Sequence, residues 1–205
     1  MDNIKLNFIN KSNDINNSNI VIFQQNVAQE FGKIAVAWKV FKNCGVMENH
    51  PFEYSPNFGV TAADSYGNFC PMVPADAGNT YEFVENEFDF VLQVSARKAA
   101  NPSEIEVTNL RRTGAIDVSC YRNMKLLAIK TKVRPGEKAY FEFEPRIFIG
   151  LASEIEAGDI LNSDIISTIN AEINLLGITS ADIVLTGGGA GPNSAPFNFV
   201  LENVK

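Results

Sequence analysis

Histidine is almost absent from this chain: His50 is the only one among 205 residues. A single histidine excludes metal sites that need two or more, among them the HExxH zinc motif and the two-histidine iron triad of oxygenases. A Ser-His-Asp triad would have to use His50, and no Gly-x-Ser-x-Gly motif accompanies it. Because His50 stands next to Pro51 in an expected loop, we predict an exposed or capping side chain rather than a catalytic one.

Cysteine is also scarce. The three cysteines are odd in number, widely spaced and contain no CxxC pair: Cys44, Cys70 and Cys120. Such spacing argues against a disulfide framework and favours reduced, partly buried thiols. Cys120 lies in the run Asp117–Tyr121, which reads as a strand, so we expect it to be packed and unreactive.

Long apolar runs are missing as well. No stretch of about 18 apolar residues occurs, so we expect no transmembrane segment. Residues 1–10 lack the basic and apolar regions of a secretory signal peptide. Together these absences predict a cytoplasmic protein, with non-classical export left open.

Positive charge is in the minority, since 17 Lys and Arg stand against 24 Asp and Glu for a net charge of −7. This balance argues against nucleic acid and anionic membranes as partners. The glycine run of residues 186–191 has the composition of a phosphate loop, but no Lys or Arg lies between Arg146 and Lys205. Prolines and a strand pattern follow it instead of a helix N-terminus. We therefore expect a connection between two strands, and no cofactor.

What the sequence has is a succession of short β patterns. In Ile4–Ile9, apolar residues alternate with Lys5 and Asn7, which is the period of a half-buried strand. Further strands are expected at residues 20–25, 33–41, 52–60, 81–84, 88–95, 105–109, 116–121, 125–132, 140–144, 146–152, 172–176, 181–185 and 197–204. The chain is thus predicted to be all-β, an antiparallel β-sandwich of about a dozen strands with at most one short helix, forming a single domain over residues 1–205. Fifteen Phe side chains would fill much of the space between the sheets.

Several details of this sandwich can be predicted. We expect residues 4–9 and 20–25 to pair as a hairpin, and residues 33–41, apolar on both faces, to lie centrally with Trp38 buried. Pro56 should break the strand at 52–60, which implies an edge position or a bulge. Pro135 and Gly136 predict a type II turn. Residues 159–176 read either as helix or as strand: a helix or turn near 163–169, followed by a strand at 172–176, is the interpretation we adopt.

Two oxygen-rich loops are candidate cation sites. They provide carboxylate and amide oxygens of the kind that calcium binds, from Asp64, Asn68, Asp76 and Asn79. The EF-hand spacing is absent, and the same residue types are what tight turns require. Glu142 and Glu144 form a carboxylate pair on one strand face, for which a solvated face is the simpler interpretation.

One resemblance extends these observations. The segments 8–12, 20–25 and 36–39 resemble the opening of a group of small, mostly uncharacterised bacterial β-rich proteins, and residues 150–161 are compatible with it. That group is loosely labelled aromatic ring-opening dioxygenase. The resemblance implies a bacterial β-sandwich and carries over no site residue. The enzymatic label conflicts with the single histidine, since a non-haem iron facial triad needs two.

The function that these patterns favour is a non-enzymatic binding or self-assembling structural module. Edge strands at residues 4–9 and 197–204 would add to a neighbour's sheet and give a homo-oligomer, with a glycan or protein ligand also possible. One alternative is a lectin-like or membrane-active effector, although Trp38 reads as buried and leaves no aromatic anchor for a sugar. A second is a metal-dependent hydrolase or oxygenase built on Asp64, Asp76 and His50.

Overall fold

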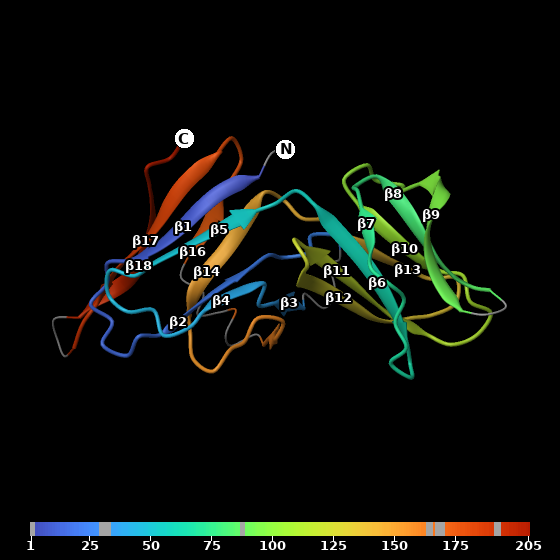
Figure 1. The fold of residues 1–205 in the computed structure, drawn as a ribbon, viewed down its shortest axis with the longest axis horizontal. Helices are drawn as coiled ribbons and strands as arrows, with labels where there is room; N and C mark the ends of the chain where they lie inside the picture. Colours follow the sequence, from blue (N-terminus) through green and yellow to red (C-terminus); the bar gives the residue numbers. More distant parts are fainter. Residues whose placement is uncertain (1–2, 29–33, 87–88, 163–165, 167–170, 191–193) are drawn as a thin grey trace. The chain divides into compact units, whose positions relative to one another are not determined.

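The computed structural model describes residues 3–28, 34–86, 89–162, 166, 171–190 and 194–205 (Figure 1). Its contacts divide the chain into two compact units. Unit 1 consists of Met1–Gln24, Ala35–Pro56 and Pro145–Lys205, and unit 2 of Gln25–Ile34 and Asn57–Glu144. Each unit has sheets of its own and is described by itself, and the single domain expected over residues 1–205 stays a prediction.

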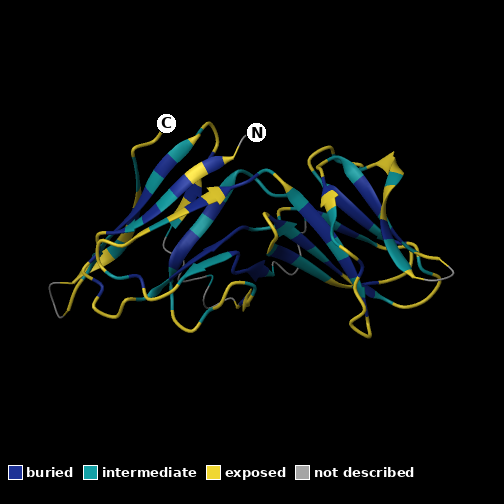
Figure 2. Cartoon of the chain, in the orientation of Figure 1, coloured by how far each residue is buried: buried dark blue, intermediate teal, exposed yellow. Residues whose placement is uncertain are grey.

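The all-β sandwich class is confirmed. The described residues form four sheets of four strands and one of two strands. The strands are more numerous than the predicted dozen, because apolar runs such as residues 33–41 and 52–60 are each divided in two. Most neighbouring strands are antiparallel, whereas β1 with β17 and β8 with β10 are parallel. Figure 2 shows the alternation of buried and more exposed residues along the strands on which the prediction depended.

The first sheet of unit 1, called sheet A, has the order β18-β17-β1-β5. Its strands are β1 (Ile4–Asn10), β5 (Asn49–Tyr54), β17 (Ser180–Gly188) and β18 (Ala195–Glu202). The expected edge position of residues 4–9 is wrong, because β1 pairs with β17 on one side and β5 on the other. The hairpin expected with residues 20–25 is also wrong. Alternation shows that a strand is half-buried, but it does not identify the strand's neighbours.

The second sheet of unit 1, sheet B, has the order β16-β14-β2-β4. It contains β2 (Asn19–Phe23), β4 (Lys39–Phe41), β14 (Arg146–Ala152) and β16 (Ala171–Asn174). Sheet A packs on it through ring contacts such as Phe8 with Phe41, whose centroids lie 6.0 Å apart. The opposite face of β2 is covered too, since Val21 and Phe23 pack in a cluster with Ala35, Ala37 and Leu161.

Residues 33–41 do not form the predicted central strand. They supply β3 (Ala35–Val36), which pairs with β15 (Ile160–Leu161), and β4 at the edge of sheet B. The run is apolar on both faces because it lines the layer beside sheet B, with Trp38 buried as predicted. The strand predicted at residues 172–176 is confirmed as β16, while most of the helix expected near 163–169 lies outside the described residues.

Unit 2 is a sandwich of two further sheets, of order β12-β11-β6-β7 and β13-β10-β8-β9. The strands are β6 (Phe58–Asp64), β7 (Val73–Ala75), β8 (Asn79–Glu85), β9 (Phe90–Lys98), β10 (Ile105–Asn109), β11 (Ile116–Arg122), β12 (Lys125–Val133) and β13 (Lys138–Phe141). One buried cluster joins both sheets, with Val60 and Val118 from the first and Phe83 and Val107 from the second. Most of these strands lie within a few residues of the predicted ranges.

Proline and glycine act where the sequence indicated. β5 ends at Tyr54 and β6 begins at Phe58, so the chain breaks around Pro56, and β5 is an edge strand as predicted. Gly136 has φ of +81°, and the N–H of Glu137 donates to the carbonyl of Arg134 at 2.9 Å. Both features confirm the predicted type II turn.

The short segment that follows β2 belongs to unit 2, and its Asn26 side chain hydrogen-bonds to the end of β13. Its Nδ2 donates to the carbonyl of Tyr140 (2.8 Å), and its Oδ1 accepts from the N–H of Glu142 (2.9 Å). The N–H of Val27 donates to the carbonyl of Glu142 (2.9 Å). The Asn26 amide thus replaces a piece of β-ladder beside β13, and it places Glu142 next to this segment rather than in a carboxylate pair on a strand.

We expect Asn26→Ala to lower the free energy of unfolding by about 1–3 kcal/mol, because it leaves the partly buried groups of Tyr140 and Glu142 without their partners. Urea unfolding monitored by circular dichroism measures this. Asn3→Ala is the matched control, since Asn3 makes an exposed hydrogen bond to Glu53. Equal stability of the two variants would contradict the role given to Asn26.

Candidate functional site

His50 lies on β5, so the predicted loop position is wrong. Its ring stacks on Phe41 with centroids 4.9 Å apart and lies 6.1 Å from Phe8. Nε2 is 3.3 Å from Oε2 of Glu48, yet it is buried and has no well-formed hydrogen bond within the described part of the chain. β5 starts earlier than predicted, at Asn49, because Pro51 is tolerated on an edge strand. The ring belongs to the packing between sheets A and B.

The first predicted cation loop is closed on itself. Oδ1 of Asp64 accepts the N–H groups of Tyr66 (2.9 Å) and Asn68 (3.0 Å), and Oδ2 accepts Nδ2 of Asn68 (3.1 Å). The hydrogen bond from the Asn68 side chain, followed by those from the backbone, holds the pKa of Asp64 below its usual value. The carboxylate therefore already organises the turn after β6.

The second predicted loop is built differently. The N–H of Asp76 donates to the Tyr81 hydroxyl (3.0 Å), and the N–H of Asn79 donates to the carbonyl of Asp76 (3.3 Å). Oδ1 of Asn79 accepts from Nζ of Lys98 at 2.5 Å. This oxygen therefore faces an ammonium group rather than an open site.

The two loops do not come together. The register pairs Ala75 with Phe58 at one end of β6, whereas Asp64 ends the same strand. Six residues of strand correspond to about 20 Å, so Asp64 and Asp76 cannot bind one ion. The part of the chain that the structure describes contains no group of three or more His, Cys, Asp or Glu positioned to hold a metal. Calcium at either loop stays a prediction, and His50 belongs to unit 1 rather than to the unit of these loops.

The thiols of Cys44 and Cys120 are poor nucleophiles. All three cysteines are free and buried. Burial raises the pKa of Cys44 to about 11 and that of Cys120 to about 12. A thiol with such a pKa is almost entirely protonated at neutral pH, and the packed position predicted for Cys120 is confirmed.

A buried carboxylate that sequence reasoning missed is Glu106 on β10. Its Oε2 accepts from Nζ of Lys138 (2.5 Å) and from the Thr80 hydroxyl (3.1 Å), and its Oε1 accepts the N–H of Ala100 (2.8 Å). Burial alone would raise the pKa of Glu106, but the Lys138 hydrogen bond, with those from Ala100 and Thr80, outweighs it and lowers the pKa. Both oxygens are occupied, so this carboxylate holds β8, β10 and β13 together. In the sequence it looks like any polar position in an alternating strand.

The glycine run connects β17 and β18, as predicted. Gly187 has φ of +89°, and a Cβ there would lie 2.1 Å from the carbonyl oxygen of Pro196. Gly188 has φ of +76°, and a Cβ there would meet the Phe197 ring at 2.6 Å. Both positions require glycine for close packing of the hairpin, which is an architectural reason for the run.

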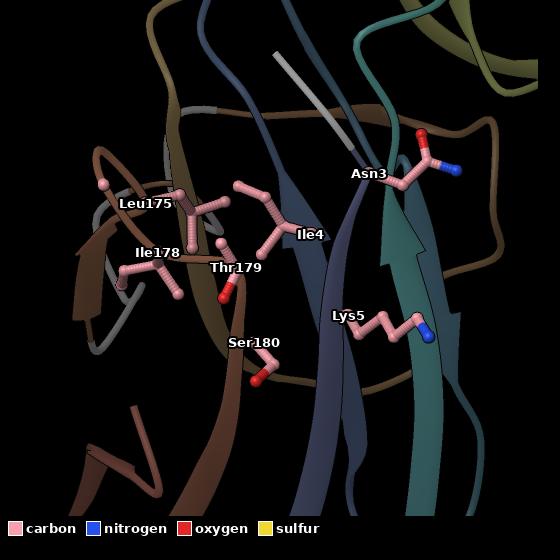
Figure 3. A pocket seen from close by; sticks show the side chains of 8 residues that line it. Asn3, Ile4, Lys5, Leu175, Ile178, Thr179 and Ser180 are labelled. Carbon is pink, nitrogen blue, oxygen red and sulfur yellow. The ribbon is translucent and has the colours of Figure 1, made fainter. Parts of the chain in front are cut away.

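A cavity of about 510 Å³ opens at the end of sheet A where β1 begins (Figure 3). Ile4 and Leu175 point toward one another across it, while Lys5 extends to the other side of β1. The hydroxyl and N–H of Thr179 donate to the carbonyl of Lys205 (3.0 and 2.7 Å). The lining combines apolar side chains with the hydroxyl groups of Thr179 and Ser180 and with Asn3 and Lys5, and it contains no carboxylate.

The edge of sheet A is the more informative feature, and the direction of its backbone groups can be derived. The N–H groups of Lys5 and Lys11 donate to the carbonyls of Thr179 (3.0 Å) and Leu185 (2.9 Å). The backbone N–H and C=O groups of the odd-numbered residues of β17 therefore point toward β1. Since successive residues of a strand direct their backbone groups to opposite sides, the even-numbered residues of β17 face β18.

The register of β17 with β18 then fixes the orientation of the edge strand. The β18 residues opposite Asp182, Val184 and Thr186 face β17; they are Glu202, Val200 and Asn198. The residues between them direct their backbone N–H and C=O groups away from β17, toward the free edge of the sheet. These residues are Phe197, Phe199 and Leu201. Within the described ranges, these three form no backbone hydrogen bond beyond the ladder of the hairpin. Their side chains lie on the inner face of sheet A, where Phe199 is buried against Phe8 at a centroid distance of 6.4 Å.

Most other edge strands carry features that oppose pairing. Proline interrupts β5 and β7 at Pro51 and Pro74, and basic residues occupy β12 (Lys125, Lys130, Lys132) and the end of β9 (Arg97, Lys98). β4, β13 and β16 are short, and β13 is also covered by the segment that contains Asn26. Proline, lysine and short length are the devices that prevent edge pairing. β18 is an edge strand of sheet A and has none of them from Phe197 to Leu201. The stretch Phe90–Ala96 of β9 also lacks proline and lysine, although basic residues follow it.

Fold and edge together define an all-β sandwich protein whose edge strand β18 contains a stretch, Phe197–Leu201, without proline or lysine. No protein-family model matches the chain, and neither a curated protein nor a solved structure matches it. Among the residues that the structure describes, no helix has the length and apolarity needed to cross a membrane.

The contacts of Glu106 predict a pH dependence of stability. Its pKa is lower in the folded than in the unfolded protein, where it is about 4.3. The stabilisation is complete above the unfolded pKa and is lost as the pH falls through the folded one. We expect Glu106→Gln to lower the free energy of unfolding at pH 7 by about 1.5–3 kcal/mol and to flatten its decline below pH 5.

Urea unfolding between pH 3 and pH 8 measures both effects. Glu156→Gln is the control, because Glu156 forms an exposed ion pair with Lys42. An unchanged acid slope in Glu106→Gln would show that Glu106 is not the group responsible.

Proposed function

We propose that this protein is a non-enzymatic binding or self-assembling module that works by strand addition at β18. The observation that carries the proposal is the row of outward-facing backbone groups of Phe197, Phe199 and Leu201, with neither proline nor lysine among them. An added strand gains backbone hydrogen bonds from such an edge, and side-chain contacts provide its specificity.

The side chains of β18 support this role. The outer face of the strand carries the exposed Asn198 and Val200, so a partner strand meets little charge there. Glu202, the single charged residue of β18, is neutralised by Lys11, whose Nζ lies 3.0 Å from its Oε2. Like charges opposite one another destabilise strand pairs, and this edge presents none.

The chemically capable side chains that the structure describes are engaged in packing or hydrogen bonds. His50 is packed between rings, the Cys120 thiol is buried, and Glu106 is saturated by hydrogen bonds. Each of these side chains has a structural task that explains its position.

We expect Val200→Lys to weaken association about tenfold, because a lysine on an edge strand opposes pairing. Val200→Thr keeps β propensity and size without charge and serves as the matched control. Size-exclusion chromatography with light scattering over a range of protein concentrations measures the effect. The proposal requires wild type and Val200→Thr to associate more strongly than Val200→Lys. A wild type that stays monomeric at high concentration contradicts the self-assembly part.

A further inference from the structure

We infer that the strand added to β18 is β18 of a second copy. The two strands are antiparallel and related by a two-fold axis that passes between their Phe199 residues. This inference rests on the proposed function and specifies its partner and register. The paired strands would join two copies of sheet A into one continuous sheet.

The backbone of β18 is self-complementary about Phe199. Its outward-facing residues are placed symmetrically, two positions on either side of that residue. In an antiparallel pair, Phe199 faces Phe199 of the second copy, and Phe197 faces Leu201. Each outward-facing N–H and C=O then finds a partner in a hydrogen-bonded pair.

The side chains agree with this register. Phe197 opposite Leu201 and Phe199 opposite Phe199 give aromatic and apolar cross-strand pairs on the inner face, the kind that stabilises sheets. On the outer face, Asn198 stands opposite Val200. Glu202 stands opposite Pro196, so the two carboxylates of the dimer are at opposite ends of the interface, each beside its own Lys11.

Neighbouring registers are poorer. A shift by one residue brings outward-facing groups of one strand against inward-facing groups of the other and removes the hydrogen bonds. A shift by two residues places Val200 opposite Val200, so outward-facing residues still meet each other. It leaves two hydrogen-bonded pairs, both Phe199 with Leu201, in place of three. It also puts Phe197 opposite Asn203, whose amide already donates to Asp182 at 2.6 Å.

A disulfide tests the register directly. In the inferred dimer, Asn198 and Val200 of the second copy form a non-hydrogen-bonded pair with Cα atoms about 4.5 Å apart. Disulfides span Cα separations of about 4.4–6.8 Å. The double variant Asn198→Cys/Val200→Cys should therefore become a covalent dimer under mild oxidation, measured by non-reducing electrophoresis.

The controls are provided by the same strand. Each single variant, Asn198→Cys or Val200→Cys, should give at least tenfold less covalent dimer, since its thiol faces Val200 or Asn198 of the second copy. Wild type should give none, because Cys44, Cys70 and Cys120 are buried. Retained secondary structure and thermal unfolding temperature verify that each variant is folded.

Each outcome has a defined meaning. Covalent dimer from the double variant alone supports the inference. Covalent dimer from Val200→Cys alone or from Asn198→Cys alone indicates a register shifted by two residues and overturns the inference. Association that is sensitive to Val200→Lys without any covalent dimer overturns the two-fold pairing but leaves strand addition at β18 intact. A protein that neither associates nor cross-links contradicts both the inference and self-assembly.

Discussion

Backbone hydrogen bonding at the sheet edges is the constraint on which the rest of this structure depends. A chain built almost entirely from strands has many edges, and every edge exposes N–H and C=O groups that pair with any extended segment. This protein limits that exposure locally. Asn26 covers β13 with its side-chain amide, Pro51 and Pro74 remove donors from β5 and β7, and β12 is lined by lysines. The stretch Phe197–Leu201 of β18 has none of these features.

Packing explains why ionisable side chains that could act in catalysis have structural roles in this protein. The imidazole of His50 serves as a flat ring in the stack with Phe8 and Phe41. Glu106 is buried because three donors from separate segments converge on it, and the hydrogen bonds offset the cost of removing its charge from water. In both cases the neighbours define the role of the residue.

The extent to which the sequence predicts this fold follows from the range of each signal. Alternation is local, so it predicted that residues 4–9 form a half-buried strand, and the turn at Pro135 and Gly136 is equally local. The neighbours of β1 are β5 and β17, distant in the chain, and no local pattern distinguishes a central from an edge strand of this kind. For the same reason Asn26 and Glu106 escaped notice, since the partners that give them their roles lie far away in sequence.

The candidate site was predicted in part. Residues 197–204 were expected to be an edge strand, and β18 is one. Which of its residues face outward could not be predicted, because that depends on the pairing of β17 with β1 and on the register of the final hairpin.

The orientation of the β18 residues also limits which groups a partner strand can contact. The outward-facing backbone groups belong to the residues whose side chains point into unit 1, so on the outer face of the sheet a partner strand meets Asn198 and Val200. An edge of only three such residues forms few hydrogen bonds, each worth about 0.5–1.5 kcal/mol net, against the entropy that association costs. We therefore expect the proposed pairing at β18 to be weak for a single interface, and to depend strongly on protein concentration and on single substitutions along the strand.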